Sequence, residues 1–339
     1  MATMRAVDIQ GGVGDATKLF INDQSPVPEL KDGELLVKVK AFGLNRMDLM
    51  QRQGMYPLPP QAPKTLGVEF SGTVEKVSGD VGDFKVNDAV FGLAYGGAYA
   101  EYIAVNAKMC IHKPKEVSWV QAAGIPEVWI TATQALWTVG RFKPGMRVLI
   151  HAGASGVGIA AVQLAKHAGA AAVYVTAGSD EKIKFCVEQL GADAGFNYKT
   201  QNFAEEIMKA TENKGVDLIV DPVGQTHFQK DIDCAARDGA IVVLAMMSGP
   251  VAKEVNIGPI LFKRLRIEGT TLRSRDLEYQ RALRDKVVEE ALPGIVDGSL
   301  KVFVDKVFDW TDIIEAHKHM ESNDSQGKII CTTNYYKEE

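Results

Sequence analysis

The segment from residue 147 to residue 169 constrains the fold of this chain more than any other. Its apolar run at 148–150 is typical of a buried strand, a glycine-rich turn follows at 153–158, and residues 159–168 read as a helix that Gly169 ends. This order predicts one unit of a parallel α/β sheet, and the free backbone N–H groups at the start of such a helix bind phosphate. The segment therefore predicts a dinucleotide site, with a ligand-free tight turn as the alternative. The residues expected to contact the pyrophosphate are Ser155, Gly156 and Val157.

The residues after the next predicted strand, 172–177, indicate which dinucleotide binds. NAD sites usually carry an Asp or Glu at this strand end, where the carboxylate accepts hydrogen bonds from the ribose hydroxyls. Here Gly178 and Ser179 occupy the strand end and Lys182 follows one helical turn later. A hydroxyl and a cation thus replace an acid that would repel a phosphate, and Tyr198 after the third strand offers a phenolic contact. These residues favour NADPH; the alternative is a helix cap at Ser179 followed by a solvated lysine.

Composition places the chain among enzymes with about two domains. Its 339 residues and 46% apolar content are enough for a sizeable core, and a formal charge of −5 without a long block of like charge argues against a nucleic-acid surface. No apolar run reaches the length of a signal peptide or a membrane span. The four cysteines are far apart and lack a C-x-x-C pair, which is typical of reduced thiols. We therefore expect a cytoplasmic protein without a membrane or nucleic-acid partner.

The pattern of the chain changes near residue 125. Before it, β-rich runs between Gly, Asn, Asp and Pro predict a compact antiparallel barrel; the runs are 34–39, 72–77, 89–93 and 99–105. After it, strands alternate with helices, which predicts a doubly wound parallel sheet; the strands are 147–151, 172–177, 195–198, 216–221, 240–245 and 266–271. Six strands complete such a sheet. The remaining elements are therefore expected to return to the first domain; they are helices at 276–291 and 311–321 and strands at 302–308 and 327–332.

Four segments carry a resemblance to a known family: 44–54 (LNRMDLMQRQG), 123–129 (AGIPEVW), 151–158 (HAGASGVG) and 272–275 (LRSR). With the barrel placed before the dinucleotide unit, the chain resembles, over essentially its whole length, the zinc-independent quinone oxidoreductases of the medium-chain dehydrogenase/reductase superfamily. Ser155 stands where a G-x-G-x-x-G motif has its middle glycine, a departure typical of this branch. The resemblance implies an α/β protein with two domains. They are a GroES-like β-barrel catalytic domain, residues 1–124 with 273–339, and a Rossmann NADP-binding domain, residues 125–272.

The resemblance also allows the need for a metal to be checked. Zinc enzymes of the superfamily hold a developing alkoxide with a catalytic zinc on three protein ligands. Where such an enzyme has a Cys just after a Gly, this chain has Gly43-Leu44-Asn45, and where it has Gly-His-Glu, this chain has Gly67-Val68-Glu69. The six histidines show no metal-ligand grouping, and His151 is expected to hydrogen-bond behind the site rather than act as an acid. No metal is therefore expected.

A hydride acceptor that needs no Lewis acid is then required, and a quinone suits because its ring becomes aromatic on reduction. The resemblance places the active site, in the cleft between the domains, beside Asn45 and the loop 53–57. Tyr56 of this loop is the candidate proton donor, with an aromatic wall against the substrate as an equally weighted alternative. Asn45 is similar to the family asparagine that contacts the cofactor near the nicotinamide ribose, and its alternative is a turn-stabilising residue after Gly43.

Further cofactor contacts are expected where the fifth and sixth strands end, because carboxyl strand ends line the ligand crevice of a doubly wound sheet. These residues are Met246, Met247, Ser248, Thr271, Leu272 and Arg273. Core filling is the alternative for one of the two methionines. The resemblance places the Thr131 hydroxyl beside the nicotinamide, although a helical Thr bonded to its own backbone has the same pattern. Lys328, near the final strand, either reaches the cofactor pocket or is a solvated charge.

The leading hypothesis is an NADPH-dependent quinone reductase that works without zinc. An enone or alkenal reductase would need the same cofactor, a hydrophobic slot and one proton donor, so the sequence does not separate the two. A low-turnover NADPH-binding sensor protein is the alternative from another class, because fold does not fix function. The sequence leaves open the physiological acceptor and whether one electron or a hydride is transferred.

The sixth strand, 266–271, is expected at an open edge of the coenzyme sheet. Unprotected edges tend to pair with another strand, and family relatives commonly join these edges across a two-fold axis. We therefore expect a homodimer. The residues expected to bury the contact are Leu261, Phe262 and Leu265, and Arg264 and Arg266 are expected to make it salt-sensitive.

Overall fold

The chain divides into two compact units in the computed structural model. The first unit comprises residues 1–130 and 273–339, and the second comprises residues 131–272. The structure describes residues 2–337. Within that range no helix is both long enough and apolar enough to cross a bilayer.

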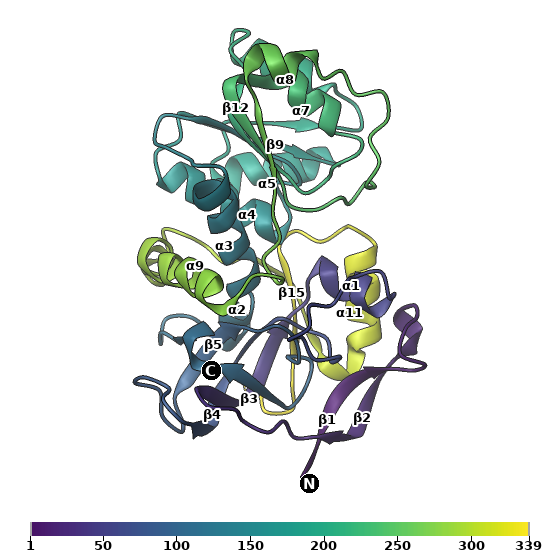
Figure 1. Ribbon diagram of the computed structural model, residues 1–339, viewed down its shortest axis with the longest axis vertical. Coiled ribbons are helices and arrows are strands. Elements are labelled where there is room, and N and C mark those ends of the chain that lie inside the picture. The colour runs from purple at the N-terminus through teal and green to yellow at the C-terminus, as the bar shows by residue number, and fades with distance from the viewer. Residues whose placement is uncertain (1, 338–339) are drawn as a thin grey trace. The chain divides into compact units, whose positions relative to one another are not determined.

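A six-stranded parallel sheet forms the second unit, as the alternation of strands and helices predicts (Figure 1). Its order is β10-β9-β8-β11-β12-β13. The strands are β8 (Arg147–Ile150), β9 (Ala172–Ala177), β10 (Ala194–Asn197), β11 (Val216–Asp221), β12 (Ala235–Val243) and β13 (Arg266–Gly269). The helices are α4 (Gly156–His167), α5 (Asp180–Leu190), α6 (Phe203–Ala210), α7 (Phe228–Cys234) and α8 (Gly258–Lys263). The chain turns back between β8 and β11, which creates the switch point where doubly wound sheets bind ligands.

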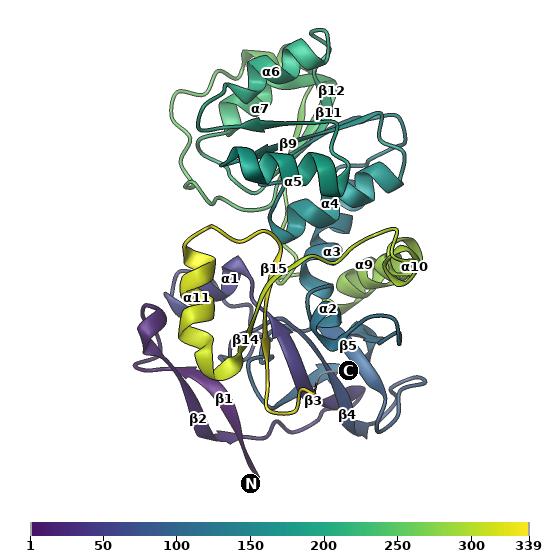
Figure 2. The ribbon, with the colours of Figure 1, turned by 180° about the vertical axis from the view of Figure 1, so that it is seen from behind.

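Helices cover both faces of this sheet, so its strands are apolar on both sides. On one face, Leu149 and Tyr174 pack in one core with Phe203 and Ile207 of α6 and with Ile232 of α7. On the other face, α4 and α5 lie side by side against β8 and β9 (Figure 2). The double cover accounts for the continuous apolar run of β8.

Two predicted strand ends are wrong, since β12 ends at Val243 rather than 245 and β13 ends at Gly269 rather than 271. Met246, Met247 and Ser248 therefore lie in the turn after β12. The Ser248 hydroxyl donates to the Val223 carbonyl at 2.8 Å, a contact that takes the chain out of the sheet. Helix α4 begins at Gly156 and not at the predicted 159, because Ser155 caps it.

The first unit contains a seven-stranded sheet of order β14-β15-β3-β4-β5-β7, with β6 paired to β3. These strands are β3 (Glu34–Gly43), β4 (Glu69–Ser78), β5 (Ala89–Leu93), β6 (Tyr102–Asn106), β7 (Cys110–His112), β14 (Val304–Asp309) and β15 (Lys328–Thr332). β15 runs antiparallel to β3 with Ile330 opposite Gly43, so the last elements return to the first unit as predicted. A separate pair, β1 (Thr3–Ile9) and β2 (Leu19–Pro26), is absent from the prediction.

Helices lie around this sheet (Figure 2). They are α1 (Arg46–Arg52), α2 (Trp119–Ala123), α9 (Leu277–Glu290), α10 (Leu292–Asp297) and α11 (Ile313–Glu321). Helix α3 (Pro126–Thr133) begins in the first unit and continues in the second as a π-helix, Gln134–Val139.

The strand β13 lies at one edge of the parallel sheet, as predicted. Before it, α8 leaves Leu261 74% exposed and Phe262 75% exposed. Leu265 is only partly buried, and it packs against the core of its own unit. Its contribution to a partner contact stays a prediction.

Candidate active site

The glycine turn between β8 and α4 builds an anion-binding helix start. Ser155 is the N-cap of α4, and its hydroxyl accepts a hydrogen bond from the Gly158 N–H at 3.1 Å. The N–H groups of Gly156 and Val157 lie in the first turn, where no helix carbonyl can reach them. A Cβ on Gly158 would lie 2.3 Å from the carbonyl oxygen of Ala152, so this approach requires glycine. The geometry fits a pyrophosphate.

The carboxyl end of β9 presents polar groups and no carboxylate. Ser179 caps α5, with its hydroxyl 3.3 Å from the Lys182 N–H that it accepts. A Cβ on Gly178 would lie 2.9 Å from the Tyr198 hydroxyl, so glycine keeps the space beside this phenol open. The helix cap that the sequence offered as an alternative is present. It does not exclude a phosphate, because a hydroxyl has a donor and a second lone pair to spare.

Thr131 carries an orphaned hydroxyl. Its oxygen is buried and finds no hydrogen-bond partner within residues 2–337, so it is not bonded to its own helix backbone. A buried hydroxyl without a partner is costly, by about 1–3 kcal/mol. A ligand that hydrogen-bonds to Thr131 would remove this cost, which fits the cofactor contact expected there.

The strand-end residues have different surroundings. Met246 is 57% exposed and Met247 49% exposed, so core filling is wrong for both. The carbonyl of Thr271 accepts a hydrogen bond from the Gln134 side chain at 3.2 Å, and Leu272 is buried. The main chain after β13 is therefore held in place from within the second unit.

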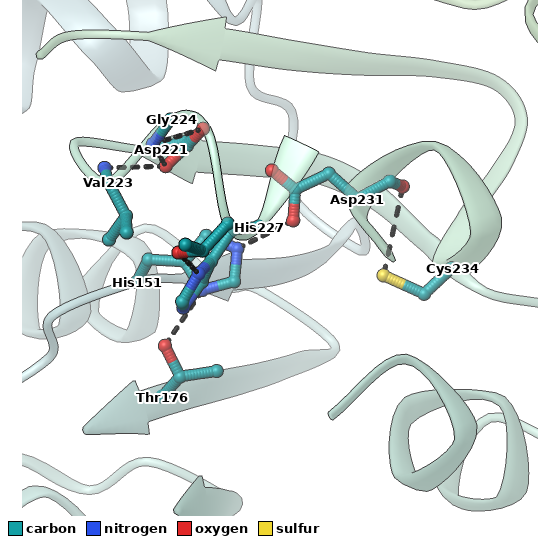
Figure 3. A network of polar contacts seen from close by, with 9 residues as sticks. His151, Thr176, Asp221, Val223, Gly224, His227, Asp231 and Cys234 are labelled. Carbon is teal, nitrogen blue, oxygen red and sulfur yellow. Dashed lines mark hydrogen bonds and ion pairs between the residues drawn. The ribbon is translucent and has the colours of Figure 1, made fainter. Parts of the chain in front are cut away.

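His151, which follows β8, lies in a buried network of polar side chains (Figure 3). Its Nδ1 lies 2.8 Å from the Thr176 hydroxyl and its Nε2 lies 2.7 Å from Asp231 Oδ1. Burial lowers the pKa of His151 to about 4 and raises the pKa of Asp231 well above its usual value, so the carboxyl O–H faces a neutral imidazole. The ring of His227 lies 4.7 Å from that of His151, and burial lowers the pKa of His227 to about 3. His151 thus hydrogen-bonds behind the glycine turn.

In the first unit, Asn45 and Lys328 meet around Glu69. The Lys328 ammonium lies 2.6 Å from Glu69 Oε1 and donates to Asn45 Oδ1 at 2.8 Å, and the Asn45 amide N–H donates to Glu69 Oε1 at 2.9 Å. All three side chains are buried. Lys328 is therefore not a solvated charge. Asn45 is the N-cap of α1, and its amide is fixed on both sides.

Glu127 adds a second carboxyl beside Glu69. It lies in the first turn of α3, is 6% exposed, and its backbone N–H donates to Glu69 Oε2 at 2.9 Å. Burial, and next the neighbouring Glu69, raise the pKa of Glu127 to about 8. Glu127 is not among the site residues predicted from the sequence. A lone charge inside the apolar run 122–130 is the signal that could have found it.

Arg273 lies beside Tyr56. Its Nε donates to the Tyr95 carbonyl at 2.6 Å, its Nη1 donates to Gln51 Oε1 at 2.8 Å, and its guanidinium carbon lies 5.4 Å from the centre of the Tyr56 ring. Its Nη2 is buried and finds no hydrogen-bond partner within residues 2–337. Burial, followed by Glu127, raises the pKa of Tyr56, which makes this phenol a weaker acid than in water. The side chain of Arg273, which the sequence predicts to contact the cofactor after the sixth strand, is held by Tyr95 and Gln51 of the first unit.

Two family models match this chain. The alcohol dehydrogenase GroES-like domain matches residues 31–115, and the zinc-binding dehydrogenase model matches residues 156–287. The quinone oxidoreductase of Homo sapiens is 32% identical over 335 residues, which cover 96% of this chain and 97% of that protein. This chain belongs to the medium-chain dehydrogenase/reductase superfamily.

Other proteins match over nearly the whole of this chain. The synaptic vesicle membrane protein VAT-1 homolog of Danio rerio is 30% identical over 354 residues, which cover 99% of this chain and 72% of that protein. The solved structure of the mycobacterial protein Rv1454c complexed with NADPH is 29% identical and superposes with a TM-score of 0.84, covering 97% of this chain and 99% of that one.

This medium-chain dehydrogenase/reductase has an amide and an apolar side chain at the positions compared with zinc ligands. Asn45 faces the Lys328 ammonium, and Val68 is buried and apolar. Among residues 2–337, no group of three or more His, Cys, Asp or Glu side chains is arranged to hold a metal ion. The charge next to Glu69 comes from Lys328.

Proposed function

We propose that this chain is an NADPH-dependent quinone reductase that works without zinc. The observation that carries the proposal is the match to quinone oxidoreductases over nearly the whole chain, together with a β9 end that lacks a carboxylate. When bound, the reduced nicotinamide supplies a hydride. NADP binding is assigned to the second unit and the catalytic groups to the first.

The residues proposed to hold the cofactor differ by the part of NADPH that they contact. Ser155, Gly156 and Val157 hold the pyrophosphate, and Gly178, Ser179, Lys182 and Tyr198 hold the 2′-phosphate. Those proposed for the nicotinamide half are Asn45, Thr131, Met246, Met247, Ser248, Thr271, Leu272, Arg273 and Lys328. Tyr56 is proposed to contact the quinone, with its ring as a wall or its hydroxyl as a donor.

Cofactor choice has a direct test. NADPH is expected to bind at least tenfold more tightly than NADH, a difference of about 1.4 kcal/mol. Lys182→Ala should remove most of that difference, because it removes the cation next to the 2′-phosphate. Fluorescence titration gives both dissociation constants, with the exposed Lys184→Ala as the matched control. Equal constants for the two cofactors in the wild type would refute the assignment.

The reaction is tested by steady-state NADPH oxidation with ortho-quinones, para-quinones and enones. Turnover with quinones that survives prolonged chelation, in protein free of zinc by elemental analysis, would support the proposal. Preferential turnover of enones would identify an enone reductase instead. Tight NADPH binding without turnover would identify a sensor.

A homodimer through β13 and a cytoplasmic location are parts of the same proposal. The support for the dimer is an open sheet edge next to the exposed Leu261 and Phe262. The replacement Phe262→Glu should shift sedimentation at micromolar concentration toward the monomer, and the remote exposed Phe20→Glu should not. Four buried, unbridged cysteines are consistent with a reducing compartment, which cell fractionation can test.

A further inference from the structure

The first unit buries five charged side chains in one cluster, called here the ionic cluster: Asp48, Glu69, Glu127, Arg273 and Lys328. Three are carboxyls and two are cations. With every carboxyl ionised the cluster would carry a net negative charge in a buried place, which is costly. One retained proton removes that charge, and the hydrogen bonds indicate which carboxyl retains it.

Two of the three carboxyls have donors that stabilise the anion. Burial raises the pKa of Asp48 to about 6, and its hydrogen bonds keep it below the pKa of Glu127, about 8. Asp48 accepts from the Asn45 N–H at 2.8 Å, from the Tyr99 hydroxyl at 3.1 Å and from the Gly67 N–H at 3.3 Å. Glu69 accepts from the Asn45 amide and from the Glu127 N–H, and it pairs with the Lys328 ammonium. These donors offset the cost of burying both negative charges.

Glu127 differs from both. No hydrogen bond reaches its side-chain carboxyl from any residue between 2 and 337. Among the charged groups around it, the anionic Glu69 has the largest effect on its pKa. The Glu127 carboxyl therefore holds the proton of the cluster. Its pKa of about 8 is also that of an acid that is protonated near neutrality and can be recharged from water.

Arg273 and Tyr56 lie near Glu127 and are suited to hold a molecule that accepts this proton. The unpartnered Nη2 of Arg273 is a buried donor beside the Tyr56 ring, and such a group is suited to the oxygen of an acceptor molecule. Both Arg273 and Tyr56 lie close enough to Glu127 for their pKa values to respond to its charge. Tyr56 itself is the poorer donor, because the same surroundings raise its pKa above the ordinary value for a phenol.

We propose that Glu127 is a catalytic acid that gives its proton to the oxygen of an acceptor held by the Nη2 of Arg273 against the ring of Tyr56. This step rests on the proposed quinone reductase function. The quinone gains two electrons and one hydrogen as a hydride and becomes a hydroquinone monoanion. The O–H bond of Glu127 then breaks, an O–H bond forms on the phenolate oxygen, and the Glu127 carboxylate regains a proton from water.

The test is the pH dependence of kcat with an ortho-naphthoquinone and saturating NADPH between about pH 6 and pH 10. A general acid must be protonated, so kcat should be high below the pKa of Glu127 and fall above about pH 8. Glu127→Gln should lower kcat about 100-fold, remove this alkaline limb and leave the Kd for NADPH unchanged. The exposed Glu116→Gln is the matched control and should keep the wild-type profile. Tyr56→Phe should change KM and keep the limb.

A second measurement does not depend on turnover. Infrared difference spectra of the full chain without cofactor should show a protonated carboxyl band that is absent from Glu127→Gln and disappears as the pH rises through about 8. If the Gln variant does not fold, Glu127→Asp should keep the titrating band and the alkaline limb with a lower kcat.

An unchanged limb in Glu127→Gln, or a limb lost in Tyr56→Phe instead, would overturn the proposal. So would a band that does not titrate. Absence of wild-type turnover with every quinone and enone would refute the proposed function and the transfer step together, and the infrared titration would then show separately whether Glu127 holds a proton.

Discussion

The ionic cluster of the first unit and the histidine network of the second are both buried, yet their central pairs differ in charge. Lys328 and Glu69 lie 2.6 Å apart as an ion pair, whereas His151 and Asp231 lie 2.7 Å apart as a neutral imidazole and a carboxylic acid. The distances are alike, so the number of surrounding donors makes the difference. Glu69 receives three, while Asp231 Oδ2 finds no partner within the described residues.

The difference indicates what each network is for. Keeping charges buried costs free energy that neutral hydrogen bonds do not, and charges are usually retained where a site needs them. The neutral network fixes the end of β8, where Ala152 adopts a left-handed φ of 52° before the glycine turn. This difference is consistent with the proposed function, in which the catalytic groups lie in the first unit and the cofactor binds to the second.

The largest expected effect comes from removing a cation from the ionic cluster. Lys328→Met should lower the free energy of unfolding by about 3–5 kcal/mol, because it leaves the Glu69 carboxylate buried without its cation. Urea denaturation followed by far-UV circular dichroism measures this. The exposed Lys76→Met should change it by less than about 0.5 kcal/mol. A loss below about 1 kcal/mol for Lys328→Met would mean that the ionic cluster is not held by this charge.

A smaller effect concerns protons in the second unit. His227 has a folded pKa of about 3, below its unfolded value of about 6.5, so the unfolded chain binds more protons between these values. Its contribution is complete above pH 6.5 and is lost as the pH falls, by about 1.4 kcal/mol per pH unit. His227→Phe should flatten the fall of unfolding free energy with decreasing pH in this window.

Urea denaturation at a series of pH values measures that slope. The exposed His167→Gln is the control and should keep the wild-type slope. If His227→Phe and the wild type had the same slope, the imidazole of His227 would be protonated in the folded protein.

The smallest expected effect concerns the neutral pair of His151 and Asp231. Asp231→Asn should cost less than about 1 kcal/mol, because an amide N–H can replace the carboxyl O–H that faces His151 Nε2. Thermal unfolding at neutral pH is sufficient to measure it. A cost of about 3–5 kcal/mol would instead mean that the mutation strands a buried imidazolium, and that both networks are ionic.

Local patterns predicted much of the fold and the elements that carry the residues proposed for the cofactor site. The apolar run 148–150 became β8, and Ser155, Gly156 and Val157 form the start of α4. Gly178 and Tyr198 lie next to each other, as a site for one phosphate requires. These features succeed because strand, turn and helix are decided by residues a few positions apart.

Other features depend on contacts between distant segments of the chain, so local patterns did not predict them. Met246, Met247 and Ser248 leave the sheet because of a contact with Val223, a residue on another segment. Leu265 packs in part against the core of its own unit, which its place in the sequence does not indicate. Glu127 was passed over because a single Glu in an apolar run has no local pattern that marks it as an acid.

The sequence by itself determined a parallel sheet with a glycine-rich turn before a helix, a preceding β-rich region and membership of a reductase family. Only the tertiary structure decided that residues 48, 69, 127, 273 and 328 meet, and that Lys328 is an ion-pair partner rather than a solvated charge. The physical reason is that a protonation state depends on burial and on charges within a few ångströms. Those neighbours come from β4, α1, α3 and β15, and their distances along the chain say nothing of their distances in space.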